Sequence, residues 1–394
     1  MDPLRRLADW MITEGRCSGD PAKVVSFYCE WLIGAGVPLW RANIAQRFAN
    51  PLLVGWGTVW RPEATETYEV THQRLQTSAY VGSAFEYVLT HQQPLRKSLR
   101  GLDAATEHSS YLEFAGQGGT DLYATFLSYG DGSLHGVTFV TQADDGFAPE
   151  DCALIEASLP ALSSALEPIT MRKSSRSLLR TYLGEGPSEA VWNGSIKRGE
   201  RTSLEAVVMF CDLRGFTALS DGADEETVLD ALNDYFDVVV QSVEQNGGDV
   251  LKFIGDGVLS VFTISSAEDR EGQYRQAAKA AEGVLCGLST ANEARAAEGG
   301  APLDVGIGLN AGRVSFGNIG SPARLDFTVL GGAVNIASRI EGLTKSLGRR
   351  VLATAAVAGA SPDRFETCGM CEIRGVAGPV EVFGLREEQA GADA

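Results

Sequence analysis

The stretch "GGDVLKFIGDGVLSVF", residues 247–262, decides the fold of the second half of this chain. Two short apolar runs flank a Gly-Asp-Gly turn, a pattern typical of a β-hairpin because glycine tolerates positive φ. Before it, apolar residues recur three and four positions apart over residues 226–247, which predicts an amphipathic helix. After it, an alanine-rich segment over residues 274–297 predicts a second helix. The hairpin therefore joins two helices.

Along the chain, strands are expected before the first of these helices and after the second. The run "LEAVVMFCDL" at 204–213 precedes the first helix, and "LDVGIGLN" at 303–310 and "GRVSFGNIG" at 312–320 follow the second. A further helix is expected to begin near Ala333. The order βαββαβ, two βαβ-type halves around a hairpin, predicts a ferredoxin-like α+β sandwich with extra strands at its end.

The composition is that of a globular protein with two or three domains, since 44% of its 394 residues are hydrophobic and 21% are charged. The net charge of −18 argues against a nucleic-acid partner, because phosphate neutralisation needs clustered Lys and Arg. No apolar run approaches the roughly 20 residues that span a bilayer, and no signal peptide or lipidation motif is recognisable. Membrane insertion is therefore not expected. Seven cysteines, an odd number, predict reduced thiols and a cytoplasmic location.

The first half of the chain has a different character, with five of the six tryptophans before residue 61. The expected elements are a helix at 22–36, a strand at 52–60, a hairpin at 121–142 that turns at 130–132, and a helix from Pro149. Pro160 is expected to kink this last helix. Polar residues at 167–201 predict an irregular connector to the second half.

Two aspartates are candidate metal ligands. Asp212 ends an apolar strand and precedes a helix, where a carboxylate suits a hard cation and free N–H groups suit phosphates. A turn or N-cap aspartate explains the same position, and Asp-Gly at 256–257 is also the preferred pair of a type I′ turn. The oxygen ligands of an EF-hand and the Walker phosphate loop are absent, and the glycine-rich run at 306–312 precedes a strand rather than a helix. The residues alone leave the metal and turn interpretations open.

Four motifs, in this order, resemble the catalytic domain of class III nucleotide cyclases. They are "FCDLRGFT" (210–217), "GGDVLKFIGDGVLSVF" (247–262), "VGIGLNAGRVSFGNIG" (305–320) and "RLDFTVLGGAVNIASRIEGLT" (324–344). The resemblance extends over about residues 204–385, nearly half of the chain. It implies cyclisation of a nucleoside triphosphate with release of pyrophosphate.

The resemblance also implies a metal site for two Mg²⁺ or Mn²⁺ ions per active site. Its ligands would be the carboxylates of Asp212 and Asp256 and the carbonyl of Leu213. One ion would activate the ribose 3′-hydroxyl and the other would neutralise the leaving pyrophosphate. Backbone N–H groups at a helix start would bind the β- and γ-phosphates, and these belong to Gly215, Phe216 and Thr217.

Four further side chains have implied roles. Asn335 would orient the ribose and Arg339 would stabilise charge on the α-phosphate, and their spacing of four places both on one helix face. Lys252 occupies the base-selecting position and Thr328 its partner position. A lysine can donate to adenine N1, and a threonine hydroxyl can accept from the 6-amino group, so the pair favours ATP.

The resemblance thus implies an adenylate cyclase, with a guanylate cyclase or a non-catalytic cyclase-like signalling protein as alternatives. The Lys and Thr pair resembles the class IIIb subgroup, which adds the hypothesis that bicarbonate stimulates activity. Two departures stand out. Gly331-Gly332 replaces a frequent Gly-Asp, and a phosphate-contacting lysine has no match in "RGVAGPVEV" (374–382), where Arg374 is the candidate replacement.

The family's active site forms between two catalytic domains, so a chain with one set of residues is expected to be a homodimer with two equivalent sites. Residues 23–167 look similar to a GAF-type sensor, chiefly in "GVTFVTQADDGFAPEDCALIEASLPALSSALE" (136–167). That similarity implies a small-molecule ligand of unknown identity. The dispersed histidines, the tryptophans and the lone Cys-x-x-Cys at 368–371 are expected to be structural. The predicted organisation is a GAF-like regulatory domain at 1–166, a connector at 167–201, a cyclase catalytic domain at 202–386 and a tail at 387–394.

Overall fold

The computed structural model describes residues 2–386 and divides into two compact units, Met1–Leu178 and Leu179–Ala394. The predicted tail at 387–394 lies outside the described residues. Within the described residues, no helix is both long and apolar enough to cross a bilayer.

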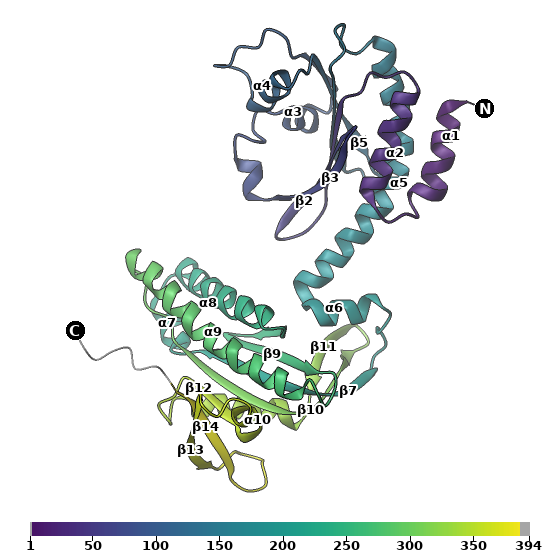
Figure 1. Ribbon diagram of the computed structural model, residues 1–394. Coiled ribbons are helices and arrows are strands. Elements are labelled where there is room, and N and C mark those ends of the chain that lie inside the picture. The colour runs from purple at the N-terminus through teal and green to yellow at the C-terminus, as the bar shows by residue number, and fades with distance from the viewer. Residues whose placement is uncertain (1, 387–394) are drawn as a thin grey trace. The chain divides into compact units, whose positions relative to one another are not determined.

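One antiparallel sheet organises the N-terminal unit (Figure 1). Its strand order is β3-β2-β1-β6-β5-β4. The strands are β1 (Arg41–Arg47), β2 (Leu53–Arg61), β3 (Ala64–Thr71), β4 (Leu95–Ser98), β5 (Asp121–Ser128) and β6 (Leu134–Thr141). The helices are α1 (Pro3–Trp10), α2 (Pro21–Gly34), α3 (Ala84–His91), α4 (Ser109–Gly116) and α5 (Pro149–Leu183), with short helical turns η1 (Met11–Gly15) and η2 (Gln73–Gln76). Helices α2 and α5 share a core with one face of the sheet, and α3 and α4 share a core with the other.

The predicted elements of this unit are confirmed where their patterns were strong. The helix at 22–36 is α2, the strand at 52–60 is β2, and β5 and β6 form the predicted hairpin. Strands β1, β3 and β4 were not predicted. Exposed Thr and Glu residues dominate the edge strand β3, and buried Arg41 and Asn43 interrupt the apolar run of β1.

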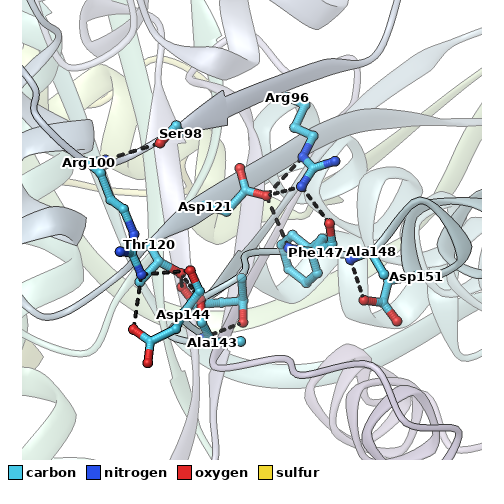
Figure 2. Close-up of polar contacts among 11 residues, drawn as sticks. Arg96, Ser98, Arg100, Thr120, Asp121, Ala143, Asp144, Phe147, Ala148 and Asp151 are labelled. Carbon is cyan, nitrogen blue, oxygen red and sulfur yellow. Dashed lines mark hydrogen bonds and ion pairs between the residues drawn. The ribbon is translucent and has the colours of Figure 1, made fainter.

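Helix α5 begins at Pro149, as predicted, and continues to Leu183 with Pro160 and Pro168 inside it. The expected irregular structure after residue 167 is therefore wrong, because α5 and the following α6 (Glu185–Trp192) are helical. Polar sequence misled the prediction, since a helix can be exposed and polar. The loop before α5 is tied to the sheet by buried Asp121, which accepts hydrogen bonds from Arg96 and from the backbone N–H of Phe147 (Figure 2).

The C-terminal unit also contains one sheet with helices packed on it (Figure 1). The sheet has eight strands in the order β13-β14-β12-β10-β7-β9-β8, with β11 paired to β10. Its strands are β7 (Arg201–Leu213), β8 (Asp249–Ile254), β9 (Gly257–Ile264), β10 (Val305–Ser321), β11 (Arg324–Leu330), β12 (Val351–Thr354), β13 (Phe365–Cys371) and β14 (Val380–Leu385). Its other helices are α7 (Phe216–Gly222), α8 (Glu225–Gln245), α9 (Arg270–Ala297), α10 (Gly332–Leu343) and α11 (Ala355–Gly359). The predicted βαββαβ order is confirmed as β7-α8-β8-β9-α9-β10.

The two faces of this sheet have separate cores. Helices α8 and α9 cover one face, where Tyr235 and Phe262 are fully buried. Truncation of Phe262 to alanine there would cost about 3–5 kcal/mol of unfolding free energy. Helix α10 covers the other face, with Ala333 and Ala337 against the strands.

Two predicted strands, at 303–310 and 312–320, are one strand, β10, because its glycines do not end the ladder with β7. Gly308 instead allows α10 to approach closely, since a Cβ there would lie 2.2 Å from the carbonyl oxygen of Ala337. The Cys-x-x-Cys segment lies in β13, and all seven cysteines are free thiols.

Candidate active site

A pair of carboxylates lies at the end of β7 and in the β8–β9 turn. Asp212 is paired in register with Gly257, which places Asp256, the preceding residue, beside it. Partial burial and the nearby charge of Asp256 raise the pKa of Asp212 to about 6. Two like charges are therefore held together at a half-buried position, which a solvated turn aspartate does not require.

A third carboxylate, Glu341 on α10, approaches this pair and was not predicted. The close contact between α10 and β10 places it there, since a Cβ at Gly306 would lie 2.3 Å from Glu341 Oε1. Burial and the charge of Asp212 raise the pKa of Glu341 to about 7, and the cation Arg214 opposes that shift. No local sequence pattern identifies Glu341, because its position depends on the packing of α10 against β10.

These residues fit the predicted cations. Carboxylates that raise one another's pKa values gain stability when a divalent cation neutralises them, and oxygen ligands are those that Mg²⁺ and Mn²⁺ prefer. Within residues 2–386, no cluster of three or more His, Cys, Asp or Glu side chains has a geometry ready to hold a metal ion. The predicted set of two aspartates and the Leu213 carbonyl does not need such a cluster.

The predicted phosphate-binding segment, residues 215–217, follows Asp212 closely along the chain. Gly215 has φ 75°, a left-handed conformation that favours glycine, and caps α7, which begins at Phe216. Gly215 and Thr217 are exposed, whereas Phe216 packs against the α8–α9 core. This segment therefore anchors one side chain in the core and leaves neighbouring backbone at the surface beside Asp212.

Lys252 and Thr328, the predicted base-selecting pair, lie on β8 and β11. The Lys252 ammonium donates to Asp326 Oδ2 at 2.7 Å. Asp326 and Thr328 are two apart on a strand, so they point to the same face. Thr328 is only 6% exposed. The structure thus brings Lys252 to the strand of its predicted partner, and it adds Asp326, which the sequence prediction missed.

Asn335 and Arg339 lie on α10, and both are exposed. Arg339 and Glu341 are two residues apart, about 200° around the helix, so they lie on nearly opposite sides of it. The structure therefore does not direct Arg339 toward the carboxylates of its own chain. Its guanidinium lies beside Gly375, since a Cβ there would be 3.1 Å from Arg339 Nη1. Exposed Arg374, the candidate phosphate-contacting residue, immediately precedes Gly375.

The C-terminal unit has an α+β fold, and its sheet holds two mutually repelling carboxylates beside the start of a helix. Such an arrangement defines a class of domain suited to binding cations and phosphates. Residues 200–386 match the family described as "Adenylate and Guanylate cyclase catalytic domain". The C-terminal unit therefore carries a class III adenylate/guanylate cyclase catalytic domain with mixed α+β content.

Curated relatives support this assignment over part of their length. The chain is 34% identical over 167 residues to "Adenylate cyclase" of Anabaena cylindrica, which covers 41% of this chain and 32% of the relative. It is 31% identical over 181 residues to "Adenylate cyclase 1" of Rhizobium meliloti, which covers 45% of this chain and 27% of the relative. The chain thus spans about a third or less of these relatives. Among solved structures, the adenylyl cyclase CyaB from P. aeruginosa is 27% identical with a TM-score of 0.44, covering 48% of this chain and 98% of that chain.

Proposed function

We propose that this protein is an adenylate cyclase that converts ATP to 3′,5′-cyclic AMP and pyrophosphate, which makes it a phosphorus-oxygen lyase. The observation that carries the proposal is the half-buried Asp212–Asp256 pair within a segment that matches the cyclase family. Divalent cations at this pair would supply Lewis-acid activation of the 3′-hydroxyl and charge neutralisation of the triphosphate. Two Mg²⁺ or Mn²⁺ ions per active site are proposed, with the Leu213 carbonyl as a further ligand.

The remaining residues bind and orient the substrate. Backbone N–H groups at the start of α7, those of Gly215, Phe216 and Thr217, receive the β- and γ-phosphates. Asn335 holds the ribose, and the Arg339 guanidinium stabilises negative charge as it develops on the α-phosphate. Because Arg339 is exposed, it is available to a substrate bound at the surface of α10.

Base selection favours ATP over GTP. Lys252 is a donor only, which suits the acceptor N1 of adenine, whereas N1 of guanine carries a hydrogen. Asp326 accepts from Lys252 and keeps the ammonium beside the strand that carries Thr328. Guanylate cyclase activity of the same fold is the alternative, because the family includes both substrates.

The active enzyme is proposed to be a homodimer. Large apolar side chains are exposed on and around the strands that carry Lys252 and Thr328, and they are Phe253 (50%), Ile254 (49%), Ile319 (39%), Leu325 (40%) and Leu330 (52%). A second copy of the chain would remove this apolar surface from water. It would also bring the Asp212–Asp256 pair of one protomer to Asn335 and Arg339 of the other, so a monomer is expected to be inactive.

The N-terminal unit is proposed to be a GAF-like regulatory domain that acts on the cyclase domain through α5 and α6. An antiparallel sheet with helices against both faces and a cavity under one of them supports this role. Coupling requires a ligand with unequal affinity for two states of the protein. The domain boundaries proposed are 1–166, 167–201 and 202–386.

The test is mass-spectrometric detection of product from purified full-length protein with Mn²⁺-ATP and, separately, Mn²⁺-GTP. We expect cyclic AMP to predominate, and Asp212→Ala to reduce its formation at least about 100-fold. Asp230→Ala, on the exposed side of α8, is the matched control and should leave the rate unchanged. A predominance of cyclic GMP would transfer the proposal to guanylate cyclase. Absence of both products would indicate a non-catalytic signalling protein.

A further inference from the structure

A cavity of about 280 Å³ lies in the N-terminal unit on the face of the sheet covered by α3 and α4. Its floor is formed by residues of β1, β2 and β3 that point away from α2 and α5. Apolar side chains line much of it, among them Val54, Val70, Leu89 and Leu122. Sites of this kind usually bind small molecules through an apolar lining and a few polar groups.

The most unusual group in this cavity is Arg41. Its side chain lines the cavity although the residue is only 9% exposed, and its Nε atom is buried without a hydrogen-bond partner. The guanidinium lies over the ring of Phe114, 4.7 Å from its centroid. Burial, followed by the nearby cation Arg61, lowers the pKa of Arg41. The nearby Tyr68 and Glu113 act to raise this pKa, without a hydrogen bond to the Nε atom. A buried cation without a hydrogen-bonded counter-ion destabilises a fold, so an anion from outside the chain would stabilise this one.

The other charges of the cavity have the same sign. Arg47 and Arg74 also line it, against one carboxylate, Glu113, which is exposed. Three arginines therefore gather around one cavity in a chain whose net charge is −18. This local excess of positive charge attracts anions.

The polar floor beside Arg41 is preorganised. The Tyr68 hydroxyl donates to Asn43 Oδ1 at 3.0 Å, and Asn43 is 8% exposed. The Tyr68 ring can lie across β2 only because residue 57 is glycine, since a Cβ there would be 2.2 Å from the ring. Asn43 is on the same face of β1 as Arg41, two residues away. The ring, the amide and the guanidinium thus form one surface for a ligand head group.

We propose that this cavity binds a small organic anion, a molecule that carries one carboxylate or phosphate group on an apolar body, with Arg41 as its counter-ion. The guanidinium forms a bidentate pair with the anionic group, and the apolar body contacts Phe114 and Leu122. The cavity is too small for a second domain or a long peptide. Regulation by such a ligand rests on the proposed cyclase function, whereas the binding itself does not.

The test follows thermal unfolding of the full chain by tryptophan fluorescence. Five of the six tryptophans belong to the N-terminal unit, so the signal reports mainly on that unit. The probes are benzoate and phenyl phosphate, with benzamide as the neutral isostere of benzoate, all at constant pH and ionic strength. At about 100 times its dissociation constant, an anionic probe is expected to raise the melting temperature by roughly 5–10 °C. Benzamide is expected to have no effect. Of benzoate and phenyl phosphate, the anion that raises the melting temperature more shows whether the cavity prefers a carboxylate or a phosphate.

Arg41→Met provides the second measurement. It removes the buried charge and keeps most of the volume, so the ligand-free melting temperature should rise while the response to both anions disappears. Arg41→Lys should retain a weaker response, and Arg6→Met, an exposed arginine on α1, should change neither quantity. Equal stabilisation by benzamide and benzoate, no response to either anion, or a response that survives Arg41→Met would each overturn the proposal. None of these readouts depends on cyclase activity.

Discussion

The two units differ in the sign of the charge that folding leaves uncompensated. In the N-terminal unit it is one buried cation, Arg41, inside a cavity that a single chain lines completely. In the C-terminal unit it is a group of carboxylates, Asp212, Asp256 and Glu341, near the surface. Neither arrangement is favourable for stability alone, because like charges repel and a buried charge is desolvated. Each is understandable as half of a binding site, the first for an anion and the second for cations.

The units also differ in whether one chain supplies all the residues of the site. Arg41, Asn43 and Tyr68 converge within one chain, whereas Arg339 lies nearly opposite Glu341 on α10 and faces away from the carboxylates of its own chain. A single chain therefore forms the cavity but does not direct Arg339 toward the Asp212–Asp256 pair. The largest expected effect follows from this difference.

Asp256→Ala and Arg339→Ala should each lose at least about 100-fold in cyclic AMP formation, because in the proposed homodimer each variant lacks one half of both active sites. When the two inactive variants are mixed at equal concentration and allowed to exchange subunits, about half of the dimers should be mixed. Each mixed dimer has one intact site of two, so about a quarter of wild-type activity should return. The measurement is the initial rate with Mn²⁺-ATP. A mixture as inactive as its components would show that both residues serve the same site.

Lys252→Glu should give the next largest effect, on substrate choice. A carboxylate accepts from N1–H and the 2-amino group of guanine but cannot donate to adenine N1. We expect the ratio of kcat/KM for ATP to that for GTP to fall at least about tenfold, equivalent to the loss of one good hydrogen bond. Lys279→Glu on the exposed side of α9 makes the same charge change away from the site. An unchanged ratio in Lys252→Glu would remove the base-selecting role.

The carboxylates should make the metal-free protein sensitive to pH. Their folded-state pKa values, about 6 for Asp212 and about 7 for Glu341, lie above the ordinary values of 3.8 and 4.5. Their contribution to stability is therefore fully present below about pH 4 and is lost as the pH rises through 6 and 7. In EDTA, the calorimetric transition of the C-terminal unit should occur at a lower temperature at pH 7.5 than at pH 5.

Glu341→Gln isolates this effect. It removes one of the repelling charges, so it should raise the metal-free melting temperature by a few degrees at pH 7.5 and change it little at pH 5. Mn²⁺ at pH 7.5 should stabilise the wild-type chain, which retains all three carboxylates. A variant that is less stable than the wild type at pH 7.5 would show that Glu341 stabilises the fold rather than opposing it.

The sequence predicted the C-terminal unit better than the N-terminal one, for a physical reason. Residues 204–297 contain strong periodic signals, and the hairpin around Asp256 has turn residues that admit few alternatives. The N-terminal sheet includes β1, whose buried Arg41 and Asn43 imitate a polar loop. Only the fold shows that these polar residues line a cavity.

The same limit applies to the candidate active site. Asp212 and Asp256 were candidates because each ends a strand or occupies a tight turn, but only the resemblance to the cyclase motifs favoured metal ligands over turn residues. Glu341 joins them through the approach of α10 to β10 at Gly306 and Gly308, a contact between elements that no local pattern encodes. Asp326 was easier to anticipate, because it lies two residues before Thr328 and therefore on the same face of the strand.

Asp326→Asn should give the smallest effect and tests whether the Lys252 ammonium needs a fixed position. Both side chains are partly exposed, 29% for Lys252 and 59% for Asp326, so their ion pair contributes at most about 1 kcal/mol. Without it, Lys252 samples more rotamers, and KM for ATP should rise up to about fivefold while kcat stays constant. The measurement is KM and kcat for ATP from steady-state kinetics. Asp363→Asn, a change at an exposed aspartate elsewhere in the unit, is the control. A fall in kcat with unchanged KM would instead place Asp326 in the chemical step, because ground-state positioning of the base affects binding alone.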